Sequence, residues 1–234
     1  MHDVPYTGWA DFVERWWRER PPASRTVLDL ACGTANSTLP WLDRGWEAVG
    51  VDASDAMLAV ARAKLAGRAE LVLADATTLD LGRRFGLVWC VFDSINYLLD
   101  PADALRLIER AALHAEPGGV VAVDANTPYG LENLWDAPEV GEELGATEYH
   151  WIHRFERETQ IASVRCKFRV RAENGAWESF EETHQERGYE PEFLAEAFAH
   201  SGLIDVAALE FPGGEPAGKL SRRAWILGRK LGSA

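Results

Sequence analysis

The chain is poor in cysteine, in positive charge and in long apolar runs. Its three cysteines, Cys32, Cys90 and Cys166, are odd in number and have no C-x-x-C spacing. We therefore expect reduced thiols in a cytoplasmic protein rather than a disulfide or metal framework. No stretch approaches the roughly 18 apolar residues of a membrane span, and the N-terminus lacks the apolar core of a secretory signal. We expect a protein that is neither membrane-bound nor secreted.

Basic residues are outnumbered by acidic ones. The 24 lysines and arginines stand against 37 aspartates and glutamates, which gives a formal net charge of -13. Such a charge repels a phosphate backbone, so nucleic acid is a disfavoured partner. A chain of 234 residues can bury about 70% of its unfolded surface around one core. We expect a single domain over residues 1–234.

Residues 26–35 look like the first strand and turn of a nucleotide-binding sheet. Apolar residues lead into the small-residue turn Ala31-Cys32-Gly33, and a helix follows from about Thr34. Small residues let a ligand approach the backbone closely. The next apolar segment ends at Asp52, whose carboxylate can accept both hydroxyls of a ribose. The pattern predicts a nucleoside site at this edge of the sheet.

Apolar strands and amphipathic helices alternate along most of the chain, which predicts an α/β fold. We expect a doubly wound, Rossmann-like sheet of seven mostly parallel strands, with an amphipathic cap helix at 8–20 that ends at Pro21-Pro22. The other helices are expected at 35–44, 54–65, 102–115 and 191–201, and the strands at 26–30, 47–51, 69–74, 86–92, 119–125, 204–210 and 223–229. Ligands of such sheets bind beyond the carboxyl ends of the strands.

Residues 148–188 do not follow this alternation of strands and helices. Apolar and basic residues alternate from 164 to 171, which predicts an antiparallel strand with one face in water. Asn174-Gly175 suits a two-residue hairpin loop. That loop would pair Arg171 with Glu178 and Lys167 with Glu182. We expect a β-rich insertion on the substrate side, whose exposed hairpin at 163–186 would form a contact between two copies of the chain.

Five segments in order resemble the motifs of class I S-adenosylmethionine-dependent methyltransferases. They are Val-Leu-Asp-Leu-Ala-Cys-Gly-Thr-Ala at 27–35, Gly-Val-Asp-Ala-Ser-Asp-Ala-Met-Leu at 50–58, Ala-Asp-Ala at 74–76, Val-Phe-Asp-Ser-Ile-Asn-Tyr-Leu at 91–98 and Glu-Pro-Gly-Gly at 116–119. The likeness is nearest to small-molecule enzymes, including aminosugar N,N-dimethyltransferases, which carry a β-rich insertion after the fifth strand. It implies SN2 methyl transfer from S-adenosylmethionine to a small-molecule acceptor, with nitrogen favoured over oxygen and S-adenosylhomocysteine as product.

The resemblance assigns the first two motifs to the ribose and amino-acid parts of the donor. Asp29 suits its ammonium group, and the backbone of the turn Ala31, Cys32 and Gly33 approaches its carboxylate and ribose. Asp52 suits the ribose hydroxyls. The alternatives are a loop-stabilising carboxylate for Asp29 and a helix cap for Asp52.

Later motifs are assigned to the adenine and to the reactive end of the donor. Ala53 and Met57 would wall the adenine, with a core position as the alternative for Met57. Asp75 would accept from the adenine amino group beside the backbone N–H of Ala76, or form a solvated turn. The backbone carbonyl of Phe92 would contact the methionine end.

Asp93, directly after the fourth predicted strand, should face the transferred methyl group. It would bind a cationic amine or accept its proton; alternatively it caps the turn that follows. The other candidates are polar aromatic residues: His184 and Tyr97 as catalytic groups, and Tyr6, Tyr129 and Tyr189 around the acceptor. His150 and His153 face opposite sides of an alternating strand, so we expect no metal site.

Two other functions fit parts of the pattern. A nicotinamide-dependent oxidoreductase would share the use of Asp52, but the turn lacks a complete G-x-G-x-x-G and the chain has no Tyr-x-x-x-Lys pair. A catalytically idle donor-binding protein would act as a regulatory or interaction subunit. The turn also departs from the family pattern, because Ala31 and Ala35 stand where glycine is common.

Overall fold

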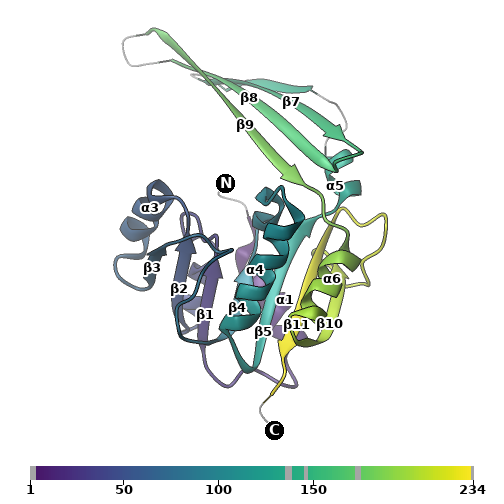
Figure 1. Cartoon of the computed structure of the whole chain (residues 1–234). Helices are drawn as coiled ribbons and strands as arrows, with labels where there is room; N and C mark the ends of the chain where they lie inside the picture. The colour runs from purple at the N-terminus through teal and green to yellow at the C-terminus, as the bar shows by residue number, and fades with distance from the viewer. Residues whose placement is uncertain (1–3, 135–138, 145–146, 172–174, 233–234) are drawn as a thin grey trace.

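The protein is described here by a computed structural model that covers residues 4–134, 139–144, 147–171 and 175–232. Its main sheet has seven strands in the order β10-β11-β5-β4-β1-β2-β3 (Figure 1). These strands are β1 (Thr26–Leu30), β2 (Glu47–Asp52), β3 (Glu70–Leu73), β4 (Phe85–Cys90), β5 (Ala115–Asn126), β10 (Leu203–Glu210) and β11 (Arg223–Lys230). Strands β1 to β5 pair in parallel, and β10 and β11 are antiparallel additions. The expected α/β fold with a mostly parallel seven-stranded sheet is confirmed.

The chain winds outward from β1 through β2 to β3 and then returns to place β4 on the other side of β1. This reversal makes the carboxyl ends of β1 and β4 the switch point of the sheet, where such folds bind ligands. Both strands are buried along most of their length. Alternate side chains of β1 therefore enter different cores: Val27 lies in one hydrophobic cluster, and Leu28 and Leu30 lie in the other.

Helices cover both faces of the sheet (Figure 1). They are α1 (Tyr6–Trp16), α2 (Leu39–Asp43), α3 (Asp55–Leu65), α4 (Pro101–His114), α5 (Pro128–Glu132), α6 (Pro191–His200) and the 3-10 turn η1 (Ser94–Tyr97). Buried residues of α4 and α6 join the core on one face, and those of α1 and α2 join the tryptophan-rich core on the other. The sheet is thus held between two apolar layers, which leaves its carboxyl edge to carry polar groups.

Two helices are shorter than the sequence predicts. The helix expected at 35–44 spans Leu39–Asp43, because Ala35 adopts a left-handed conformation (φ 61°) that an α-helix cannot contain. The cap helix expected at 8–20 spans Tyr6–Trp16. No helix within the described residues is both long and apolar enough to cross a membrane.

A second, four-stranded antiparallel sheet follows α5 and projects from the carboxyl edge of the main sheet (Figure 1). Its strands are β6 (Glu139–Leu144), β7 (Thr147–Glu156), β8 (Ile161–Arg171) and β9 (Trp177–Arg187), in that order. It therefore begins earlier than the insertion expected at 148–188. Its last strand returns to the main body beside η1.

The predicted hairpin register is wrong by one residue. Arg171 lies opposite Trp177 and Lys167 opposite Glu181, rather than opposite Glu178 and Glu182. The observed register places Phe168 opposite Phe180, with their rings stacked at a centroid distance of 4.9 Å. A slip of one residue would turn this pair to opposite faces, so the aromatic contact favours the observed pairing. Asn174, on which the predicted loop depended, lies outside the described residues.

Candidate functional site

Asp29 is buried beneath the first turn, at the end of β1. Its Oδ2 accepts hydrogen bonds from Ser37 Oγ at 2.7 Å and from Thr38 Oγ1 at 2.6 Å. Burial raises the pKa of this carboxyl to about 7, against the lowering effect of the two hydroxyls. The contacts fit the loop-stabilising alternative for Asp29, and its contact with the donor ammonium stays a prediction.

The turn after β1 is built from left-handed residues. Ala31, Gly33 and Ala35 have φ values of 55°, 53° and 61°, a conformation that costs a non-glycine residue about 1 kcal/mol or more. The Cys32 N–H donates to the carbonyl of Val51 at 3.0 Å and so ties the turn to β2. A β-carbon at Gly50 would lie 2.8 Å from Cys32 Sγ, so glycine there permits this close approach.

Asp52 connects the two predicted donor motifs. Its Oδ2 accepts from the Gly33 N–H at 2.8 Å and its Oδ1 accepts from the Ser54 N–H at 2.8 Å. Ser54 in turn caps α3 through the Met57 N–H at 3.3 Å. Each carboxylate oxygen has a second lone pair, and the side chain is only half-buried, so Asp52 can still accept from a diol. It therefore serves both as a fixed part of the loop and as a candidate ribose ligand.

The residues expected at the adenine lie on the surface of the same edge. Met57 is 48% exposed and Ala53 is exposed, so the core alternative for Met57 is wrong. Asp75 Oδ1 accepts from the backbone N–H and the hydroxyl of Thr77, at 2.8 and 2.7 Å, which fixes the loop after β3. The Ala76 N–H makes no hydrogen bond with the residues that the structure describes, so it remains able to donate to a ligand.

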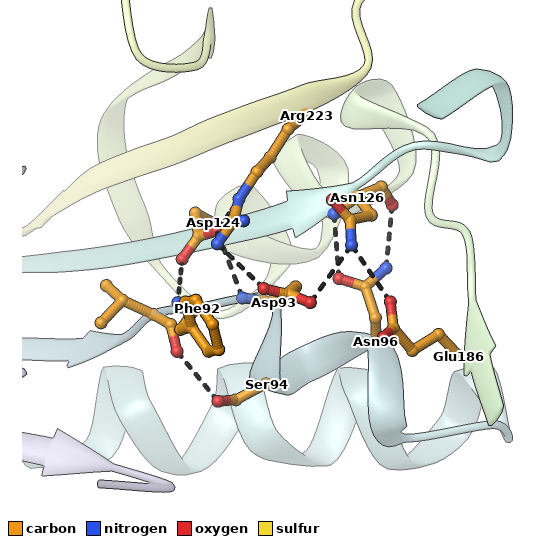
Figure 2. Close-up of polar contacts among 9 residues, drawn as sticks. Phe92, Asp93, Ser94, Asn96, Asp124, Asn126, Glu186 and Arg223 are labelled. Carbon is orange, nitrogen blue, oxygen red and sulfur yellow. Dashed lines mark hydrogen bonds and ion pairs between the residues drawn. The ribbon is translucent and has the colours of Figure 1, made fainter. Parts of the chain in front are cut away.

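The turn after β4 holds two consecutive left-handed residues, Phe92 (φ 64°) and Asp93 (φ 49°). Their N–H groups donate to the two oxygens of Asp124 in β5, at 2.6 and 3.3 Å (Figure 2). Each such residue costs about 1–2 kcal/mol, and the structure around it must offset that cost. Asp124 is therefore the anchor of this turn.

Arg223, the first residue of β11, neutralises the anchor. It forms ion pairs with Asp124 and, at 3.1 Å, with Asp93 Oδ1. Its guanidinium lies 4.5 Å from the ring centroid of Phe211 and 5.4 Å from that of Trp9. Burial raises the pKa of Asp124 to about 6 and also raises that of Asp93, while Arg223 lowers both. Aromatic rings and two carboxylates thus hold this arginine in place.

Asn126 and Asn96 join the end of β5 to the turn and to β9 (Figure 2). Asn126 Nδ2 donates to Asp93 Oδ2 at 3.2 Å and to Glu186 Oε2 at 3.0 Å. Asn96 bonds both backbone groups of Asn126, at 2.9 and 2.8 Å, and its Nδ2 also donates to the carbonyl of Arg187 at 2.7 Å. The insertion sheet is therefore tied by side chains to the turn that carries Asp93.

The predicted aromatic residues lie in different surroundings. Tyr97, in the η1 turn that follows Asp93, is 52% exposed, and its ring meets that of His184 edge-on at a centroid distance of 6.4 Å. The ring of Tyr6 lies beside that of Phe92, at a centroid distance of 6.0 Å, and burial raises the pKa of Tyr6 to about 12. Tyr189 is buried, and its hydroxyl donates to the carbonyl of Leu98, so its side chain belongs to the core.

Tyr129 lies in α5, where its carbonyl accepts from Asn133. Among the described residues, the side chain of Tyr129 makes no hydrogen bond to Asp93 or to the residues that hold Asp93. The structure therefore brings Tyr6, Tyr97 and His184 near the Phe92-Asp93 turn and gives no such contact for Tyr129 or Tyr189. Their roles toward an acceptor stay predictions.

The two histidines of β7 lie on opposite faces of the strand, because side chains alternate between the faces along a β-strand. His150 Nε2 lies 3.3 Å from Glu139, and His153 is buried on the opposite face of the strand. No group of three or more histidine, cysteine, aspartate or glutamate side chains within the described ranges is arranged to hold a metal ion.

Sequence reasoning missed Asp124, Arg223 and Glu186. Asp124 is the one charged residue in the apolar run Val120–Ala125, and a buried charge indicates a partner. That partner is Arg223, which stands at the start of the apolar strand β11. Glu186 gives no such signal, because many acidic residues surround it in β9.

Comparisons with known proteins agree with this geometry. A family described as a methyltransferase domain matches residues 27–119. The chain is 30% identical to the dTDP-3-amino-3,6-dideoxy-α-D-glucopyranose N,N-dimethyltransferase of Streptomyces fradiae, over 86% of this chain and 77% of that enzyme.

Two solved structures share the whole fold. An S-adenosylmethionine-dependent methyltransferase from Clostridium acetobutylicum superposes with a TM-score of 0.86 at 28% identity, over 99% of this chain and 94% of that one. The sugar N-methyltransferase KedS8 from Streptoalloteichus superposes with a TM-score of 0.79 at 27% identity, over 97% of this chain and 88% of that one. Fold, site and relatives together show that the chain belongs to the class I S-adenosylmethionine-dependent methyltransferases and is an enzyme of that family, similar to the aminosugar N,N-dimethyltransferases.

Proposed function

We propose that this enzyme methylates a nitrogen atom of a small-molecule amine. The observation that carries the proposal is the excess of negative charge at the Phe92-Asp93 turn. There Arg223 pairs with Asp93 and Asp124, while the amide of Asn126 joins a third carboxylate, Glu186, to Asp93 (Figure 2). Asp124 is buried against Arg223, whereas Asp93 and Glu186 are half-buried, so these two carboxylates can attract an ammonium group. A neutral alcohol offers no such compensation.

The residues of the carboxyl edge fit S-adenosylmethionine, which supplies a methyl group activated by a sulfonium. Asp52 would accept the ribose hydroxyls with its second lone pairs while it holds the Gly33 turn. Exposed Ala53 and Met57 would wall the adenine, and Asp75 with the Ala76 N–H would bind its edge. The carbonyl of Phe92 would face the methionine end.

The relatives support a nitrogen acceptor. The Streptomyces fradiae enzyme is named for an aminosugar nucleotide, and KedS8 is named as a sugar N-methyltransferase. A carboxylate is too weak a base to deprotonate a hydroxyl but suits the binding and deprotonation of an ammonium. Holding the acceptor in line with the methyl group would supply much of the rate enhancement.

The partner and location proposals rest on charge and thiols. A net charge of -13 disfavours nucleic acid, and three free cysteines fit a cytoplasmic protein. The exposed hairpin of β8 and β9 offers a surface for a second copy of the chain. The competing functions are an idle donor-binding protein and, with less support, a nicotinamide-dependent oxidoreductase.

A matched pair of acceptors tests the proposal. We expect the enzyme to methylate dTDP-3-amino-3,6-dideoxy-α-D-glucopyranose on nitrogen, and not its counterpart with a 3-hydroxyl group, because only the amine carries a positive charge. Mass spectrometry of the products gives the readout, and calorimetry with S-adenosylhomocysteine shows that the donor site is intact. Methylation of the hydroxyl compound alone would contradict the nitrogen assignment. Tight donor binding without turnover on any amine, hydroxyl or thiol would favour the idle protein.

A further inference from the structure

A second carboxylate, Glu186, reaches the Asp93 turn from the last strand of the insertion. One amide nitrogen, Asn126 Nδ2, donates to Glu186 Oε2 at 3.0 Å and to Asp93 Oδ2 at 3.2 Å (Figure 2). An amide group has two hydrogens, so it can satisfy both carboxylates at once. Asn126 therefore holds the two acids side by side at the edge where the acceptor is expected.

The two acids differ in their other contacts. Asp93 Oδ1 is ion-paired with Arg223 at 3.1 Å, so both of its oxygens are engaged. Glu186 Oε1 makes no hydrogen bond or ion pair with any residue that the structure describes. Each Asp93 oxygen keeps one lone pair that can contact an ammonium, but within this pair of acids only Glu186 has an oxygen, Oε1, that is not already engaged and is therefore the better proton acceptor.

The charge around Glu186 also suits a cation. Three carboxylates and one guanidinium leave an excess of two negative charges when all are ionised. Burial and the nearby Asp93 raise the pKa of Glu186, which brings its proton affinity closer to that of a group that works near neutral pH. The groups that face it are Asp93 from the turn after β4, Arg223 from β11, Asn126 from β5, His184 from β9 and Tyr97 from η1.

We propose that Glu186 binds the acceptor ammonium together with Asp93 and takes its proton on Oε1, an inference that rests on the proposed amine-directed function. The N–H bond breaks and leaves its electron pair on nitrogen, and Glu186 becomes a neutral carboxylic acid. The nitrogen lone pair then forms the bond to the methyl carbon as the carbon–sulfur bond breaks with its electrons on sulfur. Glu186 returns its proton to solvent on the side of His184, which is exposed.

Binding of a simple cation tests the site without knowledge of the natural acceptor. Methylammonium chloride is titrated into the full-length protein with S-adenosylhomocysteine present, and the side-chain amide resonances of Asn126 are followed by NMR. E186Q should bind about tenfold or more weakly, the effect of losing one charge-assisted hydrogen bond. E182Q is the matched control, because Glu182 lies on the same face of β9 but contacts His184 rather than Asn126. Equal affinity in wild type and E186Q, or an equal loss in E182Q, would overturn the proposal.

The pH dependence of kcat tests the proton transfer, with dTDP-3-amino-3,6-dideoxy-α-D-glucopyranose as acceptor. Wild-type kcat should fall as the pH falls through the raised pKa of Glu186, because only the carboxylate takes a proton. E186Q should lower kcat about 100-fold and abolish this dependence, and E186D should restore part of both. An unchanged kcat and pH profile in E186Q would reject the role of Glu186 while leaving amine methylation intact. Failure of the wild type to methylate this amine would count against the proposed function, and the methylammonium titration would still decide the cation site.

Discussion

Asp52 combines a structural and a binding role in one side chain. Both of its oxygens already accept backbone N–H groups, from Gly33 and Ser54, and these contacts set the distance between the first turn and α3. The oxygens that fix the loop are those expected to receive the ribose. A ligand at Asp52 therefore meets a carboxylate whose position is set before binding, which reduces the entropic cost of binding.

Replacing Asp52 with alanine should weaken donor binding sharply. The loss of charge-assisted hydrogen bonds is worth about 1.5–3 kcal/mol, or roughly 10- to 150-fold in Kd. Calorimetry with S-adenosylhomocysteine measures the effect, and Asp52→Asn separates the charge from the shape of the loop. Asp55→Ala is the control, because Asp55 is a nearby exposed carboxylate, at the start of α3, that pairs with Arg62. An unchanged Kd in Asp52→Ala would refute the assignment.

The site residues that could be predicted from sequence are those marked by a local sequence pattern. Asp29 and Asp52 lie at the carboxyl ends of β1 and β2, and Asp93 follows β4, so each position can be predicted from one short apolar segment and the turn after it. Asp124 and Arg223 meet across 99 residues of chain. No local pattern specifies which distant strand will lie beside which, so the network that holds Asp93 required the fold.

At the scale of elements, α1 connects the core to the turn that carries Asp93. Trp9, on its buried face, lies against Phe92 and over the guanidinium of Arg223. It also meets Phe211 and Trp225 edge-on, at 5.1 and 6.3 Å. One indole thus packs against the sheet core and the left-handed turn together.

Trp9→Ala should lower the free energy of unfolding by about 3–5 kcal/mol, because it removes a large buried ring and leaves a cavity. Chemical denaturation followed by circular dichroism measures the change. Thr7→Ala, at an exposed position of the same helix, should change stability by less than about 0.5 kcal/mol. Similar stability in Trp9→Ala and wild type would show that the ring contacts contribute little.

The hairpin of β8 and β9 shows how far an element can be predicted. Alternation of apolar and basic residues correctly indicated antiparallel strands, since period two is a property of the segment itself. The predicted register is wrong because it follows from the turn dipeptide alone, which carries no information on cross-strand packing. Phe168 and Phe180 decide the pairing, and their contact exists only after both strands have formed.

For the whole molecule, the insertion sheet presents apolar rings to solvent. Phe180 is 49% and Trp177 37% exposed, on opposite faces of β9. Exposed aromatic residues on a projecting edge strand favour association with another chain. The more exposed ring, Phe180, is the basis for expecting two copies of this protein to meet on its face of the strand.

Sedimentation velocity should therefore show a dimer for the wild type and a shift toward monomer for Phe180→Glu, because the new charge opposes burial of that surface. Ser179→Glu is the control, since Ser179 is an exposed neighbour whose side chain points to the other face of the strand. A wild-type monomer at all concentrations tested, or an equal shift in both variants, would argue against this interface.

The position of Arg223 has a consequence for how the molecule is made. Asp124 and the turn at Phe92-Asp93 leave the ribosome long before β11, which carries the cation that neutralises them. Until β11 pairs with β5, Asp124 faces burial without its counterion, and the two left-handed residues lack a neutralised anchor. The reactive edge is therefore complete only when β11 pairs with β5, so a translation product that stops before residue 223 would lack the counterion of Asp124 and with it a working site.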